Sequence, residues 1–218
     1  MDFLSADLQH YIETHTSDAS ALLKKIERDT HAKVLKSRML SGHVQGRFLS
    51  LISQMIQPAR ILEIGTYTGY SAICLAEGLR PGGELITLDI NEELESRVRR
   101  YFDESGKGDQ IDYRIGDARQ IIPALTGKFD LVFIDADKAS YSHYFDLVID
   151  KMVVGGYILA DNVLWSGKVV DAKPDKDTEV IRAFNEKVQR DDRVQNLLLP
   201  LRDGVMMMRV NEHRRAGL

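Results

Sequence analysis

The sequence lacks several features that point to particular classes of protein. Its 218 residues include one cysteine, Cys74, which excludes an intramolecular disulfide and is typical of a protein of the reducing cytosol. No signal peptide opens the chain, and no apolar run approaches the roughly 20 residues that span a bilayer. The formal net charge of −4 provides no overall attraction to nucleic acid. These absences predict a cytoplasmic protein without a membrane segment.

Length and composition predict one folded domain. A chain that is 44% hydrophobic and 28% charged over 218 residues can bury a full core. Residues 1–38 have helical periodicity, with Leu4, Leu8, Tyr11 and Ile12 on one face. We therefore expect a single domain over 1–218. It consists of a helical extension over 1–38, which covers a sheet edge or builds a dimer interface, and a core over 39–218.

Helix-like and strand-like segments alternate along the predicted core. A helix over 46–57, ended by Pro58, is expected to face the core through Phe48, Leu49, Ile52, Met55 and Ile56. Apolar runs typical of buried parallel strands lie at 59–65, 84–90, 111–118, 129–134 and 157–164. The runs 196–201 and 204–210 are separated by two residues and predict a hairpin. The fold class is therefore α/β, with a doubly wound, mostly parallel seven-stranded sheet and an antiparallel last strand.

Three successive strand ends carry groups that suit an adenosine ligand. The first strand leads into Gly65 and Gly69 without the G-x-G-x-x-G pattern that binds a dinucleotide pyrophosphate. Asp89 ends the second strand and can accept hydrogen bonds from both ribose hydroxyls. Asp117 and Ala118 end the third and suit an adenine edge. An ordinary tight turn explains either glycine alone, but the combination favours a cofactor site.

Oxygen ligands gather at the ends of the fourth and fifth predicted strands. The run 129–134 leads into Asp135, Asp137 and Lys138, and the run 157–164 contains Asp161 and Asn162. Because the carboxyl ends of parallel strands meet at one sheet edge, Asp135, Asp161 and Asn162 can lie close together. An all-oxygen set favours Mg²⁺, Mn²⁺ or Ca²⁺ over zinc. A turn or a helix N-cap would explain each acid taken alone.

The motifs LEIGTYTGYS, FIDADK, GGYILADNVLWSG and LPLRDG, within residues 39–210, resemble those of a known family. They are similar to the class I S-adenosylmethionine-dependent methyltransferases, and more narrowly to the cation-dependent caffeoyl-CoA and catechol O-methyltransferases. The resemblance implies a Rossmann-like fold, S-adenosylmethionine as methyl donor and a divalent cation, Mg²⁺ first. The residues that it implies around the donor are Met39, Ser41, Glu63, Gly65, Ser71, Asp89, Asp117, Ala118, Asp135 and Asp137. The chain departs from plant members at residues 42–45, as expected for a bacterial-type member.

The same resemblance implies a mechanism for methyl transfer to an aromatic ring with two neighbouring hydroxyls. A cation at Asp135 and its partners lowers the pKa of one hydroxyl. Lys138 then acts as general base, because a nearby cation disfavours its charged form. Trp165, the only tryptophan, can stack on the acceptor ring, and Arg202 borders the same pocket. The simpler alternatives are a solvated Lys138 and a Trp165 that packs the base of its loop.

Three other functions share part of this pattern. A nicotinamide-dependent dehydrogenase has a similar fold, but the absent third glycine and the terminal hairpin argue against it. A methyltransferase acting on 5-hydroxyuridine of transfer RNA would use the same cation and lysine, and the acidic net charge weighs against it. A non-catalytic partner subunit built on the N-terminal helices is the third, and the intact cation set with Lys138 argues against it. A homodimer is expected from the resemblance.

Overall fold

The computed structural model describes residues 4–212, and the chain divides into two compact units. We call residues 4–118 the N-terminal unit and residues 119–212 the C-terminal unit. Among the described helices, none combines the length and the apolar character that crossing a membrane requires. The expectation of a single domain over 1–218 stays a prediction.

Three parallel strands form the sheet of the N-terminal unit. They are β1 (Arg60–Ile64), β2 (Glu84–Asp89) and β3 (Ile111–Ile115), in the order β3-β2-β1. The central strand is apolar and buried on both faces, as expected of a parallel sheet. Its register places Leu88 beside Ile64 and Asp89 beside Ile115, so the loops after the three strands leave the sheet at one edge.

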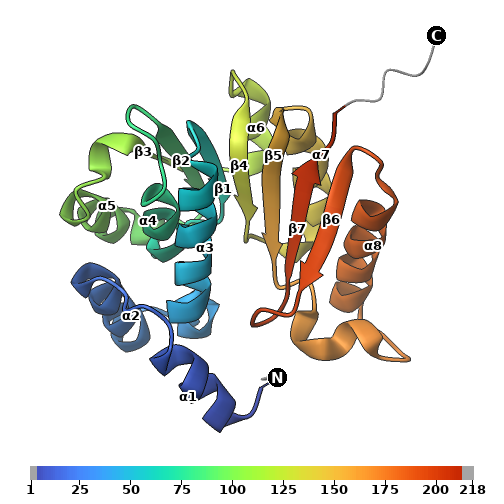
Figure 1. Cartoon of the computed structure of the whole chain (residues 1–218), viewed down its shortest axis with the longest axis horizontal. Helices are drawn as coiled ribbons and strands as arrows, with labels where there is room; N and C mark the ends of the chain where they lie inside the picture. The colour runs from blue at the N-terminus through green and yellow to red at the C-terminus, as the bar shows by residue number, and fades with distance from the viewer. Residues whose placement is uncertain (1–3, 213–218) are drawn as a thin grey trace. The chain divides into compact units, whose positions relative to one another are not determined.

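Helices surround this sheet within the same unit (Figure 1). The α-helices are α1 (Ala6–Thr14), α2 (Ala21–Lys33), α3 (Gly42–Ile56), α4 (Tyr70–Ala76) and α5 (Glu95–Glu104), with short 3-10 helices at η1 (Ser37–Met39), η2 (Glu92–Leu94) and η3 (Gly108–Gln110). The hydroxyls of Ser5 and Ser20 accept hydrogen bonds from backbone N–H groups at the starts of α1 and α2, as N-caps do. The predicted helical extension is therefore present, although α1 itself buries no residue.

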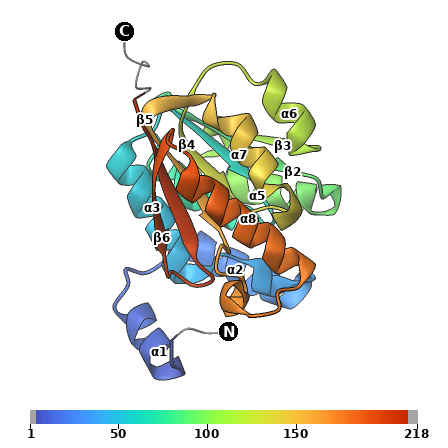
Figure 2. The same ribbon diagram turned by 90° about the vertical axis from the view of Figure 1, so that its right-hand side faces the viewer.

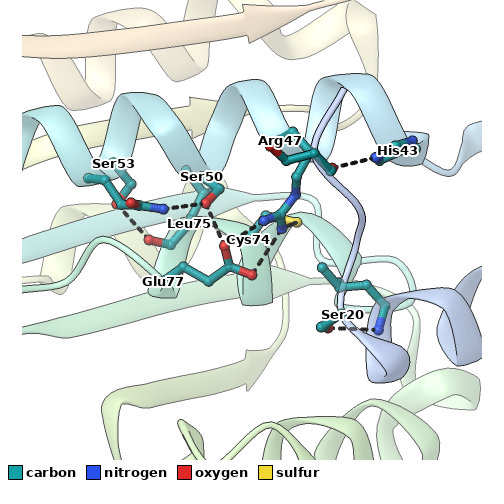
Figure 3. A network of polar contacts seen from close by, with 11 residues as sticks. Ser20, His43, Arg47, Ser50, Ser53, Cys74, Leu75 and Glu77 are labelled. Atoms are coloured by element: carbon teal, nitrogen blue, oxygen red, sulfur yellow. Dashed lines mark hydrogen bonds and ion pairs between the residues drawn. The ribbon is translucent and has the colours of Figure 1, made fainter. Parts of the chain in front are cut away.

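Helix α3 turns a polar face inward, contrary to the prediction from its apolar stripe. Its buried residues are Gln45, Gly46, Leu49, Ser50 and Ser53. Arg47 donates two hydrogen bonds to the carboxylate of Glu77, at 2.9 and 3.0 Å, and Ser53 donates to the carbonyl of Leu75 (Figure 3). Leu49 is core as expected, but Met55 is 80% exposed. The core-facing prediction was wrong for Met55 because α4 offers hydrogen-bonding partners to the opposite side of the helix.

The C-terminal unit has a four-stranded mixed sheet. Its strands are β4 (Phe129–Ile134), β5 (Met152–Asp161), β6 (Val194–Leu199) and β7 (Val205–Val210), in the order β4-β5-β7-β6. Strands β4 and β5 are parallel, and β7 is antiparallel to both of its neighbours. The helical segments are α6 (Ala118–Ala124, which begins at the unit boundary), η4 (Lys138–Ser140), α7 (Tyr141–Ile149), η5 (Trp165–Val170) and α8 (Lys176–Arg190). Helices α7 and α8 lie side by side (Figure 2).

The predicted α/β fold class, mostly parallel with an antiparallel last strand, is confirmed. The seven expected strands are found, and the closing hairpin lies where the sequence placed it. Several strand boundaries were wrong: β3 ends at Ile115 instead of residue 118, and β6 covers Val194–Leu199 instead of 196–201. β5 begins at Met152 and ends at Asp161, instead of covering 157–164, because Gly155 and Gly156 continue the strand rather than turn before it. Asn162 therefore lies just outside the strand.

Candidate active site

The loop after β1 is built from left-handed backbone. Gly65 has φ 104°, Tyr67 φ 48° and Gly69 φ 80°. A Cβ atom at Gly69 would lie 2.8 Å from the ring of Phe102, so neither the conformation nor the space at Gly69 admits a side chain. Tyr67 is a non-glycine residue in a conformation that costs roughly 1–2 kcal/mol. The predicted glycine turn therefore exists, and it leads directly into α4 at Tyr70.

The carboxylate of Asp89 is held by the backbone at the end of β2. One oxygen accepts a hydrogen bond from Tyr67 N–H at 2.6 Å and the other from Asn91 N–H at 2.8 Å. A carboxylate has about four acceptor sites, so two are left for other donors. The two bonds fix the carboxylate at the sheet edge, where it fits the hydroxyls of a ribose.

The other residues predicted around the cofactor surround the same three strands. Glu63 is fully buried in β1 and accepts a hydrogen bond from the hydroxyl of Thr87 at 2.5 Å. Ser71 is buried in the first turn of α4, and Ser41 is buried at the N-cap of α3. Met39, in η1, is 53% exposed. Asp117 and the buried Ala118 were predicted to end the third strand, but they come after β3, and Ala118 begins α6. Apart from Asp135 and Asp137, the predicted donor-binding residues thus belong to one unit.

The acidic strand ends of the C-terminal unit lie side by side. The register pairs Ile134 with Ala160, so Asp135 and Asp161 are the next residues of two neighbouring parallel strands. Asp161 is only 2% exposed. Its carboxylate accepts the N–H of Asn162 at 2.8 Å, and Asn162 has φ 61°, a left-handed conformation that asparagine tolerates. The structure therefore places Asp135, Asp161 and Asn162 at two neighbouring strand ends, and their joint role as metal ligands stays a prediction.

The hydroxyl of Tyr141 links these strand ends to Lys138. It lies 3.2 Å from the carbonyl of Ile134 and 3.0 Å from that of Asp161, and it accepts a hydrogen bond from Lys138 Nζ at 2.5 Å. Lys138 Nζ also donates to Asp135 at 3.0 Å. Complete burial, reinforced by the charges of Asp135 and Asp161, raises the pKa of Tyr141 well above its ordinary value. Tyr141 is thus a permanent phenol that connects Lys138 to both strands.

The donor set fits a hard divalent cation. Asp135 and Asp161 supply carboxylate oxygens and Asn162 an amide oxygen, which are the ligand types of Mg²⁺, Mn²⁺ and Ca²⁺. Over the described residues, no group of three or more His, Cys, Asp and Glu side chains could hold a metal ion. The predicted set has two carboxylates and one amide, so it calls for further ligands from water or from an acceptor molecule.

Asp137 is bound to Tyr144 rather than to Lys138. The Tyr144 hydroxyl donates to its carboxylate at 2.6 Å. Burial and this hydrogen bond raise the pKa of Tyr144. The prediction that Asp137 orients Lys138 has no direct contact in its favour, and its alternative role beside the cofactor amine stays a prediction.

Trp165 and Arg202 lie on two segments that are hydrogen-bonded to each other. Leu164 N–H donates to the carbonyl of Asp203 at 2.9 Å, next to each of the two predicted residues. Both Trp165 (φ 49°) and Arg202 (φ 50°) are left-handed. The two residues therefore lie on neighbouring segments of backbone, and the acceptor pocket that they were predicted to share stays a prediction.

Sequence reasoning missed Tyr141, Tyr144 and the contact that Asp203 makes. Tyr141 follows Lys138 by three residues, and the i, i+3 spacing would have suggested contact had a helix been expected to begin at residue 138. Asp203 was expected, with Arg202, in the hairpin turn at the border of the acceptor pocket, but its bond to the backbone of Ser166 has no signal in the sequence.

Comparison with known proteins gives consistent matches over nearly the whole chain. A family model described as O-methyltransferase matches residues 13–211. The caffeoyl-CoA O-methyltransferase 1 of Eucalyptus globulus is 33% identical over 213 residues, which cover 92% of this chain and 87% of the relative.

Solved structures agree with the sequence matches. The SAH-bound methyltransferase PaMTH1 of Podospora anserina has a TM-score of 0.87 and 28% identity, covering 94% of each chain. The O-methyltransferase of Bacillus cereus in complex with SAH has a TM-score of 0.86 and 30% identity, covering 94% of this chain and 97% of that one.

Proposed function

The chain belongs to the family of S-adenosylmethionine-dependent O-methyltransferases, and we propose that it methylates one hydroxyl of a catechol-like small aromatic acceptor with the help of a divalent cation. The family membership confirms the resemblance expected from the motifs. The observation that carries the finer proposal is the cluster of Asp135, Lys138, Tyr141 and Asp161 at two neighbouring strand ends. It combines oxygen ligands with a lysine, the two elements that activation of a hydroxyl requires.

In this proposal the N-terminal unit binds the methyl donor. Asp89 accepts the ribose hydroxyls with the acceptor sites that Tyr67 and Asn91 leave open. Asp117 and Ala118 flank the adenine, and Gly65 lies beside the methionine part of S-adenosylmethionine. The donor site also includes Met39, Ser41, Glu63 and Ser71.

The C-terminal unit holds the acceptor. Asp135, Asp161 and Asn162 are the residues that would hold a divalent cation. A cation held there would supply the positive charge that lowers the pKa of an acceptor hydroxyl. Lys138 is the proposed base, because its Nζ lies at these strand ends, held by Asp135 and by the hydroxyl of Tyr141.

The proposed transfer moves one proton and one methyl group. Lys138 Nζ takes the proton of the acceptor hydroxyl. The resulting phenolate oxygen forms a bond to the methyl carbon, and the bond from that carbon to sulfur breaks with its electron pair left on sulfur. Because opposite charges cancel in this step, alignment of the two reactants supplies most of the catalysis.

The acceptor class follows from the oxygen ligands and from the relatives. Three protein ligands leave about three of the six positions that Mg²⁺ prefers, enough for two neighbouring hydroxyls and a water. Curated relatives are named for caffeoyl-CoA, whose ring is a catechol. The loop after β5 carries Lys168, Lys173 and Lys176 among Asp171, Asp175 and Asp177, so it lacks the dense basic patch that a phosphorylated tail would favour.

A radiolabelled methyl-transfer screen tests the proposal. Purified protein with labelled S-adenosylmethionine and Mg²⁺ is given simple catechols, flavonoids and caffeoyl esters, each beside the matched ring with a single hydroxyl. Methylation of the diols and not of the single-hydroxyl controls is expected. Equal labelling of both would contradict bidentate binding. Labelling of unmodified bulk transfer RNA alone would replace the catechol assignment with the transfer RNA alternative.

We also propose that the protein forms a homodimer through α1 and α3. On α3, Val44, Phe48, Leu51 and Met55 follow the 4-3-4 spacing of a helix-pairing seam, and Leu51 and Met55 are 59% and 80% exposed. The only charged residue of α3, Arg47, is bound by Glu77. In a two-fold symmetric dimer the seam of one copy contacts the same seam of the other, so an uncharged seam avoids repulsion between like charges. The exposed Leu8 and Tyr11 add apolar surface on α1.

The substitution Met55→Glu tests this interface. It places like charges on the seam of both copies, so light scattering should report monomers for the variant and dimers for the parent protein. Gln54→Glu, one residue away and also exposed, is the matched control and should remain dimeric. A parent protein that is monomeric, or a Met55→Glu variant that stays dimeric, would contradict the proposed interface.

A cytoplasmic location completes the proposal. Cys74 is a free, fully buried thiol, which suits a reducing compartment. Fractionation of cells that produce the protein would check this, and recovery from an extracytoplasmic fraction would contradict it.

A further inference from the structure

The segment after β5 is bound to the turn between β6 and β7, and both lie at the same end of the four-stranded sheet (Figure 1). Val163 N–H donates to the carbonyl of Gly204 at 3.1 Å, and Leu164 N–H to that of Asp203 at 2.9 Å. Ser166 N–H donates to the side-chain carboxylate of Asp203. Only the last of these bonds depends on a side chain, so it is the one that a substitution can remove.

The bonded segments hold unusual backbone conformations. Asn162, Trp165, Ser166 and Arg202 are four of the seven non-glycine residues with positive φ in the described chain. Tryptophan and arginine gain nothing locally from a left-handed conformation. Such conformations persist where the surroundings hold them in place, and they concentrate at functional sites. The peptide between Trp165 and Ser166 is the one whose N–H reaches Asp203.

The two segments approach each other so closely at Gly204 that a side chain there would collide with Leu164. A Cβ atom there would lie 2.4 Å from Leu164 Cγ and 2.9 Å from Leu164 N, and the φ of Gly204 is 86°. The turn is therefore pressed against the residue that precedes Trp165. This contact places the Asp203 carboxylate within reach of Ser166.

The far end of the segment is anchored separately. Arg182 of α8 donates from Nε to the carbonyl of Val169 at 2.8 Å and from a terminal nitrogen to that of Asp171. Trp165 thus lies between two anchors, three residues after the predicted cation ligand Asn162. Its side chain is half-buried, which leaves part of the ring available for contact.

We propose that Asp203 is a positioning residue that determines acceptor affinity by holding Trp165 where it contacts the acceptor's aromatic ring. This inference rests on the proposed function for the nature of the acceptor. Asp203 fixes the peptide that follows Trp165 and thereby the direction of the indole. Loss of its carboxylate lets the strained segment relax, and the ring contact weakens while the donor side and the proton-transfer groups are untouched.

Two substitutions at Asp203 separate positioning from folding. Asp203→Ala removes the acceptor of the Ser166 N–H, whereas Asp203→Asn keeps a side-chain oxygen at the same place. Asp203→Ala should raise the KM for a catechol acceptor on the order of tenfold, as expected for loss of a hydrogen bond to a charged group. The kcat and the KM for S-adenosylmethionine should stay within about twofold, and Asp203→Asn should restore the acceptor KM. The exposed Asp192, changed to Ala, is the matched control.

Fluorescence gives a second readout that needs no turnover. Trp165 is the only tryptophan, so all selectively excited indole emission comes from this segment. Without any acceptor, Asp203→Ala should shift the emission and increase quenching by acrylamide, and Asp203→Asn should resemble the parent protein. Unchanged emission and an unchanged acceptor KM in Asp203→Ala would overturn the inference, as would an equal loss of donor and acceptor binding. If the parent protein methylates no catechol, the proposed function fails, while an unchanged Trp165 spectrum in Asp203→Ala still overturns the positioning role.

Discussion

The two units hold the acids at their strand ends in different ways. In the N-terminal unit, the carboxylate of Asp89 is bound by two backbone N–H groups, of Tyr67 and Asn91. In the C-terminal unit, Asp161 is also bound by a backbone N–H, but Asp135 faces the ammonium of Lys138 and Asp137 faces the phenol of Tyr144. Backbone donors are fixed, whereas side-chain donors can rotate and an ammonium can release a proton. The first arrangement suits binding and the second suits reaction, so substitutions should separate the two.

The largest effect is expected at Asp135. Asp135→Ala removes the partner of Lys138 and one proposed cation ligand, so kcat should fall on the order of 10³-fold. The affinity for S-adenosylmethionine, measured by calorimetry, should stay close to that of the parent protein. Asp146→Ala is the matched control, because Asp146 also pairs with a lysine, Lys187, but on the surface of α7. An Asp135→Ala variant with the parental kcat would contradict the proposal that the acids of the C-terminal unit serve the reaction.

Lys138→Ala should have the next largest effect. Loss of a general base typically lowers the rate by about 10²-fold or more. Donor binding should again be preserved, and Lys187→Ala serves as the control for loss of a lysine. A Lys138→Ala variant that turns over at the parental rate at every pH would remove the general-base role. It would leave the cation proposal standing.

Asp89→Ala should weaken binding of the donor and preserve kcat, the opposite of the two substitutions above. Hydrogen bonds to a charged group contribute about 1.5–3 kcal/mol, so the KM for S-adenosylmethionine should rise roughly 10- to 100-fold. At saturating donor, kcat and the acceptor KM should change little. Asp89→Asn, which retains one acceptor oxygen, should lie between the two proteins. A selective loss of kcat in Asp89→Ala would place this residue in the reaction rather than in binding.

The smallest effect on methyl transfer is expected at Cys74. Burial raises the pKa of this thiol from an ordinary 9.0 to about 12, so its thiolate is roughly a thousandfold scarcer near neutral pH. The folded protein should therefore react with thiol reagents far more slowly than the unfolded protein, and Cys74→Ala should keep nearly full activity. Rapid labelling of the folded protein accompanied by inactivation would contradict a passive role.

The sequence predicted most of the architecture because strand ends and glycine turns leave local signals. Asp135 and Asp161 were expected to be neighbours because parallel strands end at a common edge, and the register bears this out. Periodicity shows which residues of α3 share a face, but it does not show which face is buried. The buried face is the one from which Arg47 and Ser53 bind Glu77 and the carbonyl of Leu75.

Tertiary contacts explain the residues that sequence reasoning missed. The role of Tyr141 follows only from the structure, in which the ends of β4 and β5 place two carbonyls beside its hydroxyl. The contact of Asp203 with Ser166 joins two loops that are 37 residues apart in the sequence. Neither contact follows from composition or spacing.

The most direct test of the account is methyl transfer measured together with donor binding, with and without a chelator. Excess EDTA should abolish transfer to a catechol, Mg²⁺ added back should restore it, and the affinity for S-adenosylmethionine should be unchanged throughout. This result would show that transfer to the acceptor needs a cation and that binding of the donor does not. Full turnover in excess EDTA would contradict the account.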